Sequence, residues 1–289
     1  MSQVLQKMKV LPFQIPKPEN NALVYQEDKE MVFYDKFHQH EEIQISYIAE
    51  GEGTLVVGDT INYYKKGDVL AIGSNLPHVF KSDSSSNKVS VMLTFFFLKD
   101  AFGTSFFELD EFGELKSFFK NVDYGFKVSP KSKTLETYFQ QLAECSKLKR
   151  FIILLDILKI LSKSRAQLLS SFIYDKKFTD SEGKRMRDVL DFTMQNYHLQ
   201  VSLDEVAKVS AMTKNAFCKY FKKRTNKSYF TFLNELRIEN ACKLLQTTKN
   251  LSIAEIAYKS GFNNISNFNR QFKSVKKIAP SEYRKAKAI

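Results

Sequence analysis

The chain has 289 residues and a formal net charge of +12, from 44 Lys and Arg against 32 Asp and Glu. This length predicts about two domains, and a hydrophobic share of 43% is sufficient for packed cores, which excludes a wholly disordered polyelectrolyte. The surplus charge is not spread evenly. Residues 184–289 hold 21 Lys and Arg and 8 Asp and Glu, a net +13, whereas residues 1–183 hold 23 and 24, a net −1. A near-neutral module followed by a basic one favours a sensor joined to a polyanion binder.

The cysteines and the apolar segments indicate the compartment. Cys145, Cys218 and Cys242 show no paired or metal-type spacing, which indicates reduced thiols in a cytoplasm. The first residues contain no long apolar core of the kind found in signal peptides. The most apolar stretch, residues 151–161, is interrupted by charged residues and is too short to span a bilayer. We therefore expect a cytoplasmic protein without membrane contact.

The N-terminal part of the chain has a β-type pattern. Residues 1–20 are polar and rich in proline, which predicts an irregular or extended arm. From about residue 31 to residue 97, short apolar runs alternate with turns such as Gly51-Glu52-Gly53. Several short strands at this spacing predict a small antiparallel sandwich or barrel, which we place in a domain of residues 1–104.

The pattern becomes helical after Ser105. Leu148, Ile152, Leu155 and Leu158 form a broad apolar face, which could pack back on the strands or pair with its twin in a dimer. We take residues 105–165 as a candidate dimerisation region. Residues 166–183 are polar, and we expect them to be a linker.

Residues 184–289 contain a helix-turn-helix pattern that occurs twice. The first copy is Ser202–Lys208 followed by Phe217–Lys222, and the second is Ser252–Tyr258 followed by Phe268–Lys273. The copies are offset by 50 residues at their start and by 51 at their end, so the one-residue slip falls at the turn. A tandem pattern on a basic segment predicts two DNA-reading units. Seven helices are expected, at about 184–197, 203–209, 213–225, 229–246, 252–260, 264–275 and 280–286.

Caps and turns delimit the two reading helices. We expect Thr213 to cap the first and Asn263 to cap the second, and Gly261 to supply a positive φ in the turn. Phe217 and Phe268, with the aromatic residues that follow them, should face inward. Helix 229–246 carries an apolar set that lets both units dock on it. A rigid connector would separate the two readers by about one turn of DNA, roughly 34 Å.

The outward faces of both reading helices are polar, short or basic. Asn pairs well with adenine and Arg or Lys with guanine, so we expect base contacts from Asn215, Lys219, Asn267 and Arg270. Phosphate contacts are expected from Lys222, Lys223 and Lys273. The alternative is that these are ordinary solvated helix faces. The full candidate set is Thr213, Lys214, Asn215, Cys218, Lys219, Lys222, Lys223, Asn264, Ser266, Asn267, Asn269, Arg270 and Lys273.

Residues 184–289 resemble the DNA-binding domain of the AraC/XylS family of transcriptional regulators. The segments that carry the resemblance are Arg237–Leu245, Ile253–Ala257, Gly261–Phe262, Phe268–Lys273 and Pro280–Arg284. The resemblance implies that helices 213–225 and 264–275 read double-stranded DNA, and that the usual output is activation through RNA polymerase. The chain departs from the family at Thr213-Lys214, where Ser-Pro is frequent, and lacks its glycines near Asn226 and Ile278. These departures concern base preference more than fold.

Histidines gather in the N-terminal segment. His38 and His40 lie two residues apart on one side of a strand, and His78 follows on a later strand. This arrangement resembles a cupin barrel, in which some members hold a metal ion with such histidines and a downstream Glu. Gln44 stands in the position of that Glu, and a neutral amide is a poorer ligand, although Glu42 could substitute. A metal site, a metal-free pocket for a small polar molecule and packed structural histidines all remain open.

We therefore predict an α+β protein: an N-terminal antiparallel, cupin-like β-barrel with following helices, and an all-α domain with two helix-turn-helix motifs at residues 184–289. The candidate ligand contacts are His38, His40, Glu42, Gln44 and His78, with no metal or cofactor. The expected partners are promoter DNA, RNA polymerase, a small-molecule effector (sugars are frequent in the family) and a second copy of the chain.

Three other functions are weighed against this regulator. A cupin enzyme tethered to DNA needs a competent metal shell, which Gln44 weakens. An architectural DNA binder would show a steep salt dependence with little sequence preference. A methyl-transfer repair role needs a cysteine cluster, and the first 100 residues contain no cysteine. We expect a non-enzymatic regulator, most simply an activator.

Overall fold

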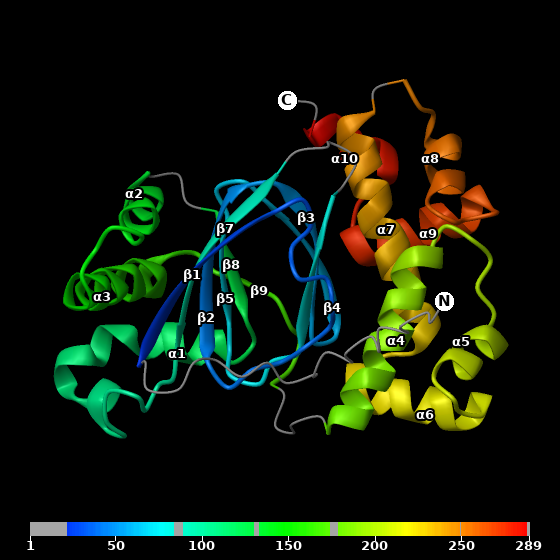
Figure 1. Cartoon of the computed structure of the whole chain (residues 1–289). Helices are drawn as coiled ribbons and strands as arrows, with labels where there is room; N and C mark the ends of the chain where they lie inside the picture. Colours follow the sequence, from blue (N-terminus) through cyan, green and yellow to red (C-terminus); the bar gives the residue numbers. More distant parts are fainter. Residues whose placement is uncertain (1–21, 84–88, 130–132, 174–178, 249, 288–289) are drawn as a thin grey trace, which may run out of the picture.

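The computed structural model describes residues 22–83, 89–129, 133–173, 179–248 and 250–287. The arm expected at residues 1–20 lies outside the described residues. Figure 1 shows a β-rich N-terminal module with helices α1 to α3 on one side (left) and a helical C-terminal domain packed against the opposite side (right). The predicted α+β class is confirmed.

Two antiparallel sheets form the N-terminal module. The larger has the strand order β1-β7-β2-β5-β8-β9, and the smaller has the order β4-β3-β6. Leu55 and Phe80 of the smaller sheet pack against Leu70 and Met92 of the larger one, so the two sheets face each other across a core. The strands thus make a cupin-like sandwich of two sheets rather than one closed ring of hydrogen bonds. The strands are β1 (Leu23–Glu30), β2 (Ile43–Glu50), β3 (Glu52–Val57), β4 (Thr60–Lys65), β5 (Val69–Ile72), β6 (His78–Ser82), β7 (Ser90–Phe97), β8 (Phe126–Val128) and β9 (Gln167–Leu168).

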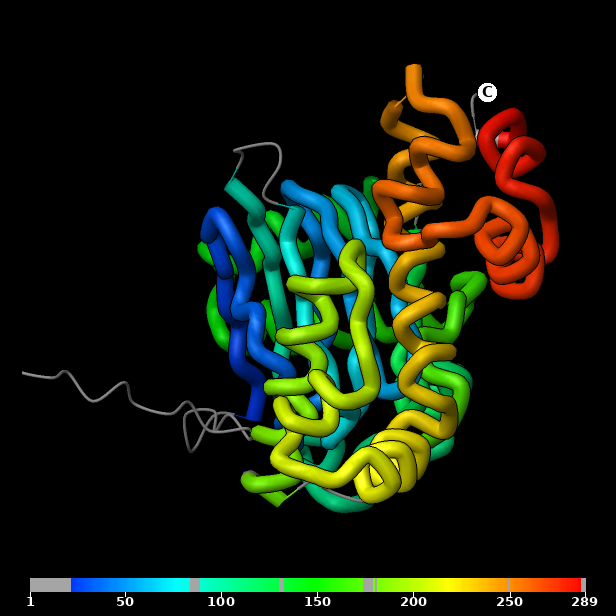
Figure 2. Tube along the Cα trace, turned by 90° about the vertical axis from the view of Figure 1, so that its right-hand side faces the viewer, coloured from blue at the N-terminus to red at the C-terminus, as the bar shows by residue number. Residues whose placement is uncertain are grey.

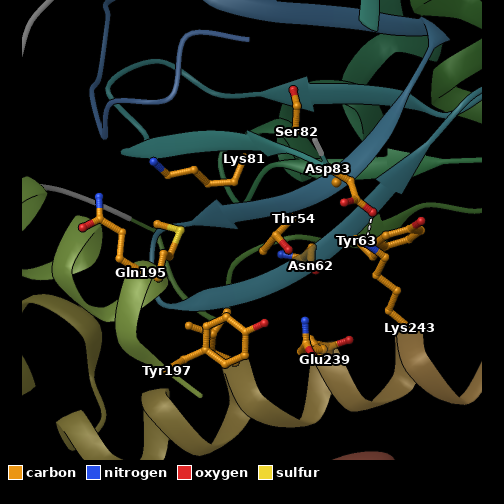
Figure 3. Close-up of a pocket in the computed structure, with 14 residues that line it drawn as sticks. Thr54, Asn62, Tyr63, Lys81, Ser82, Asp83, Gln195, Tyr197, Glu239 and Lys243 are labelled. Carbon is orange, nitrogen blue, oxygen red and sulfur yellow. Dashed lines mark ion pairs between the residues drawn. The ribbon is translucent and has the colours of Figure 1, made fainter. Parts of the chain in front are cut away.

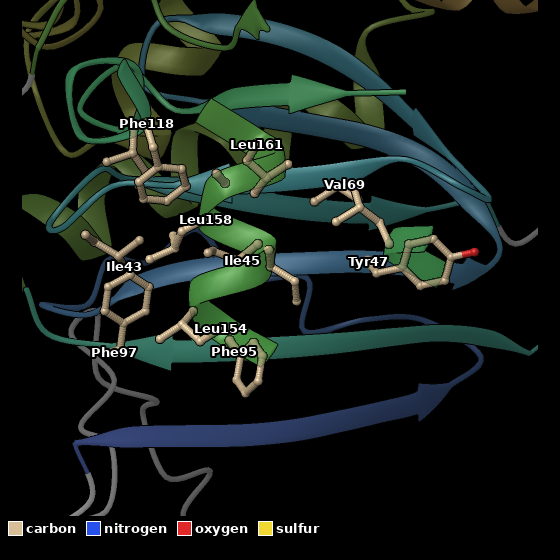
Figure 4. Packing of buried hydrophobic residues seen from close by; sticks show 14 of the residues in the cluster. Ile43, Ile45, Tyr47, Val69, Phe95, Phe97, Phe118, Leu154, Leu158 and Leu161 are labelled. Carbon is tan, nitrogen blue, oxygen red and sulfur yellow. The ribbon is translucent and has the colours of Figure 1, made fainter. Parts of the chain in front are cut away.

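The outer face of the larger sheet is covered by helix α3 (Lys147–Lys163). Its Leu154, Leu158 and Leu161 are at most 1% exposed and share one apolar cluster with Ile45 and Phe95 of the sheet (Figure 4). Of the apolar face predicted from the sequence, Leu158 is buried on the strands and Leu155 is half-buried, whereas Leu148 and Ile152 are exposed. The same side carries two short 3₁₀ turns, η2 (Phe106–Glu108) and η3 (Asp110–Leu115), and helices α1 (Lys116–Val122) and α2 (Thr134–Gln141).

Part of the predicted linker is attached to the N-terminal module. Strand β9 pairs with β8, and Leu169 is fully buried in the core between the sheets. The buried carboxylate of Asp59 then accepts hydrogen bonds from Ser170 Oγ (3.1 Å) and from the Ser171 amide (2.9 Å). Residues 167–171 are polar in composition, but one buried leucine and these hydrogen bonds hold them to the sheet.

Within the described residues 179–248 and 250–287, seven helices are present, as predicted. They are α4 (Asp180–Asn196), α5 (Leu203–Val209), α6 (Lys214–Thr225), α7 (Tyr229–Thr247), α8 (Ile253–Lys259), α9 (Ile265–Lys276) and α10 (Pro280–Lys287). Helix α4 begins four residues earlier than expected, inside the predicted linker. A capping box starts it there, because Thr179 Oγ1 accepts from the Glu182 amide (3.3 Å) while the Glu182 carboxylate accepts from the Thr179 amide (3.2 Å).

The two domains are joined by an apolar contact. Val56 and Val79, on the outer face of the smaller sheet, are fully buried and share a cluster with Met186, Val189 and Leu190 of α4. Full burial of each such side chain contributes about 1.5–3 kcal/mol, whereas a partly exposed ion pair contributes about 0–1 kcal/mol. The apolar contact therefore dominates the docking of the two domains.

Candidate nucleic-acid interface

The first helix-turn-helix unit is α5 and α6. A capping box starts α5: the Ser202 amide donates to the Glu205 carboxylate at 2.8 Å, and Ser202 Oγ accepts in return from the Glu205 amide. The turn that follows places Ala211 at φ +52°, in the left-handed region. Thr213 then caps α6, as predicted, by accepting from the Ala216 amide at 3.3 Å. The positive φ at a non-glycine residue was not expected from the sequence.

The second unit, α8 and α9, repeats this construction. Ser252 and Glu255 form the same capping box, and Gly261 has φ +91°, as the sequence predicts. The expected cap Asn263 is wrong, because α9 is capped by Asn264. Its side-chain oxygen accepts from the amides of Ser266 (2.8 Å) and Asn267 (3.1 Å). The one-residue slip between the two repeats explains the error, since the turn of the second unit is longer by one residue.

Both reading helices bury an aromatic face on α7. Phe217 and Phe221 of α6, and Phe268 and Phe272 of α9, are fully buried. The first pair packs around the N-terminal half of α7 and the second pair around its C-terminal half. Figure 2 shows the first unit (yellow) and the second unit (orange to red) arranged along this helix. The two readers are therefore fixed relative to each other by one helix.

The residues predicted to contact DNA lie on the opposite, outward faces. All are exposed except Asn267, which is half-buried: Thr213, Lys214, Asn215, Cys218, Lys219, Lys222, Lys223, Asn264, Ser266, Asn269, Arg270 and Lys273. The side-chain oxygen of Asn264 is already used to cap α9, so it is less available to contact a base. Asn267 accepts from Arg270 Nη2 at 2.9 Å and so orients this guanidinium along the helix.

The positive charge on these faces is largely uncompensated. Within the described ranges, Lys219, Lys222, Lys223 and Lys273 form no ion pair, whereas Lys214 pairs with Asp204 at 2.9 Å. Uncompensated lysines beside short polar side chains attract a phosphate backbone and leave room for base edges.

Arg237 was missed by the sequence reasoning and holds the domain together. It is 9% exposed, and its Nε and Nη2 donate to the carbonyls of Tyr197 (2.7 Å) and Leu199 (2.8 Å). Its guanidinium also lies over the ring of Phe262, and burial lowers the pKa of Arg237. It joins α7, the segment after α4 and the turn of the second unit. The sequence could have indicated this role, because Arg237 lies four residues from both Leu233 and Ala241 and therefore falls on the apolar face of its helix.

The histidines of the N-terminal module come together as predicted. His38, His40 and His78 are buried, and each Nδ1 lies 2.7–2.9 Å from a backbone carbonyl, which leaves each Nε2 directed inward. Gln44 Oε1 lies 3.1 Å from His40 Nε2, and the Glu42 carboxylate lies 3.8 Å from His40 Nδ1. All five candidate ligand contacts are therefore neighbours.

The same cluster has little room for an organic molecule between its rings. The ring centroids of His38 and His78 are 4.3 Å apart, and those of His40 and His78 are 5.1 Å apart. One ligand nitrogen from each ring lies within 4.8 Å of the others, which is a donor set that could hold a single ion. Against this, the Gln44 side chain lies against His40 Nε2 and donates to Ser46 Oγ at 2.8 Å. An ion bound at His40 Nε2 would have to displace this amide.

These features define a DNA-binding regulator with two helix-turn-helix units and a cupin-like module. A helix-turn-helix domain model matches residues 206–286, and a cupin domain model matches residues 30–95. The chain is 32% identical over 111 residues to the transcriptional activator AarP of Providencia stuartii, covering 38% of this chain and 82% of AarP. It belongs to the AraC/XylS family of transcriptional regulators.

Two longer matches extend over both domains. The chain is 23% identical over 257 residues, 87% of each protein, to YdeC of Bacillus subtilis, an uncharacterized helix-turn-helix transcriptional regulator. The crystal structure of ToxT from Vibrio cholerae covers 91% of this chain and matches over 97% of its own length, at 14% identity. The TM-score of this match is 0.37. Among the described residues, no helix has the length and apolarity needed to cross a membrane.

The two turns provide a matched test of the repeat. Ala211→Gly should raise the free energy of unfolding by up to about 1 kcal/mol, because a Cβ is unfavourable at this φ. Gly261→Ala should lower it by more than about 1 kcal/mol, since the new Cβ would lie 2.4 Å from the Tyr197 carbonyl and 2.8 Å from Arg237 Nε. Urea denaturation followed by circular dichroism measures both. Equal effects of the two variants would contradict the assigned turn geometry.

Metal analysis tests the histidine cluster. We expect the purified full-length chain to retain far less than one equivalent of zinc, iron, nickel or manganese after dialysis, because a neutral amide, Gln44, lies against His40 Nε2 and the cluster lacks a directly ligating carboxylate. Inductively coupled plasma mass spectrometry gives the metal content. One equivalent that is lost in a His78→Ala variant would establish a metal site instead.

Proposed function

We propose that this DNA-binding regulator is a one-component activator, which reads a bipartite promoter site in the cytoplasm and recruits RNA polymerase. The observation that carries the proposal is the pair of reading helices with uncompensated basic faces, α6 and α9, docked on the single helix α7. AarP, to which the C-terminal domain is similar, is named a transcriptional activator, and this supports activation rather than repression.

Base contacts are assigned to Asn215, Lys219, Asn267 and Arg270, and phosphate contacts to Lys222, Lys223 and Lys273. The exposure of these side chains other than Asn267, and the restraint of Arg270 by Asn267, support this division. Because α7 fixes the separation of the readers, the two blocks of the site should recur at one spacing, about one helical turn apart.

The N-terminal module is proposed as the sensor of a small molecule. The cupin match and the five clustered residues, His38, His40, Glu42, Gln44 and His78, support this role. A homodimer is proposed through residues 105–165. On α3, Leu148 is 70% exposed and Ile152 is 44% exposed, and these side chains lie on the surface left free by packing on the sheet.

The first test is selection of genomic DNA fragments with purified full-length protein at physiological salt, followed by sequencing. We expect an enriched motif of two short blocks whose centres are about 10–10.5 base pairs apart, because the readers are held on one helix. The genes beside the motif would then indicate the effector. Strong binding without a motif would overturn this function and favour an architectural role.

Arg270→Ala and Lys222→Ala separate base reading from phosphate contact on the selected site. Arg270→Ala should lose about 1–3 kcal/mol of binding free energy and relax the preference at one position. Lys222→Ala, the matched control, should weaken all sequences alike and reduce the salt slope by about one. Fluorescence anisotropy with cognate and scrambled duplexes at several salt concentrations measures both effects. If Arg270→Ala weakened all duplexes equally, Arg270 would be a phosphate contact.

A further inference from the structure

A cavity of about 250 Å³ lies between the two domains. One wall is the outer face of the smaller sheet, and the other is formed by the C-terminal end of α4 and the middle of α7 (Figure 3). This space can hold several water molecules or a small organic molecule, and none of the three clustered histidines lines it.

The sheet wall continues the face that docks the two domains. Thr54 is in register with Tyr63 of β4 and with Lys81 of β6, just as Val56 is in register with Ile61 and Val79 two residues along. Since side chains alternate along a strand, these two rows lie on the same face. The apolar row is buried in one cluster with α4, whereas the polar row lines the cavity.

The charged groups around the cavity already have partners of opposite sign. The ion pairs are Lys81 with Asp35 (3.0 Å) and Asp191 (3.4 Å), Lys243 with Asp83, and Glu239 with Lys276. The pair of Lys243 and Asp83 links the two walls (Figure 3). A ligand with a net charge would have to break one of these pairs or enter without a counter-charge. The cavity therefore favours an uncharged molecule.

Uncharged polar groups face the cavity from both walls. Within the part of the chain that the structure describes, neither the Thr54 hydroxyl of the sheet nor the Gln195 amide of α4 has a hydrogen-bond partner. Asn240 of α7 lies with Tyr197 on the helical side. Met194 and Leu236 add apolar surface. A matching ligand has both an apolar face and groups that donate and accept hydrogen bonds.

We propose that this cavity is the effector site, and that it takes an uncharged, amphipathic molecule with hydrogen-bonding groups which bridges the sheet and helices α4 and α7. The proposal rests on the sensor role given above and moves its organic ligand from the histidine cluster to the domain interface. A molecule that contacts both walls binds the docked arrangement more tightly than a separated one, and so stabilises docking. Because α7 also holds both readers, DNA affinity should change with occupancy, and reciprocally.

The test uses three probes of nearly equal shape and different charge: benzamide, benzoate and benzamidinium. Met194 is the reporter, through the methyl signal of the full-length chain labelled with ¹³C at methionine methyl groups and assigned with a Met194→Leu variant. We expect benzamide to shift the Met194 signal saturably, and benzoate and benzamidinium to require at least about tenfold higher concentration. Equal binding of all three probes, or no saturable shift with benzamide up to its solubility limit, would overturn the proposal.

Two variants on the sheet wall control this test. Thr54→Phe fills the cavity and should abolish the shift, whereas Thr54→Val keeps the shape, removes the hydroxyl and should weaken benzamide binding only several-fold. A shift that persists in Thr54→Phe would place the probe elsewhere and contradict the assignment.

The DNA assay is run separately, so that its failure can be distinguished from failure of the cavity proposal. On the selected DNA site, saturating benzamide should change the affinity of the wild-type chain by about fivefold or more and leave Thr54→Phe unchanged. Probe binding without any change in DNA affinity would refute the effector role. Absence of any selected DNA site would instead refute the regulator function and leave the probe-binding result standing.

Discussion

The structure depends on one apolar contact, the burial of Val56, Ile61 and Val79 against helix α4. These side chains occupy the outer face of a three-stranded sheet, which would face water if the N-terminal module stood alone. The free energy gained by burying these side chains exceeds the free energy that the surrounding ion pairs contribute, because those pairs are partly exposed to solvent. The contact holds α4 on the sheet, and helix α7 also lies directly against strand β4.

Helix α7 transmits this position to the readers. Its N-terminal half holds α6 and its C-terminal half holds α9, while buried Arg237 ties it to the segment that follows α4. Tyr220 and Arg224 of α6 also bond to Glu182 in the first turn of α4. A change at the interface between sheet and helices would therefore reach both reading helices through packed, hydrogen-bonded elements. This is the physical basis for coupling between a bound effector and DNA affinity.

The interface combines a sealed contact with a cavity on one face of one sheet. Where the strand positions are apolar, at Val56 and its neighbours, they are buried in one cluster with side chains of helix α4. Where the strand positions are polar, at Thr54 and Tyr63, a cavity lies between the sheet and the helices. The apolar row supplies most of the docking free energy, so the polar row is free to respond to a ligand. A small molecule there needs to supply only a modest increment to shift the balance between docked and separated arrangements.

The sequence by itself determined the local features of this protein. Apolar periodicity, caps such as Thr213 and the turn glycine Gly261 depend on neighbours a few residues away, so the seven C-terminal helices and the polar outward faces of α6 and α9 could be predicted. What only the tertiary structure decided involves residues far apart in the chain. The attachment of Leu169 to the sheet, the bonds of Arg237 to Tyr197 and Leu199, and the cavity between Thr54 and Asn240 each join distant segments. A local sequence pattern does not predict such contacts, because they form only when the packing of helices and strands brings distant side chains together.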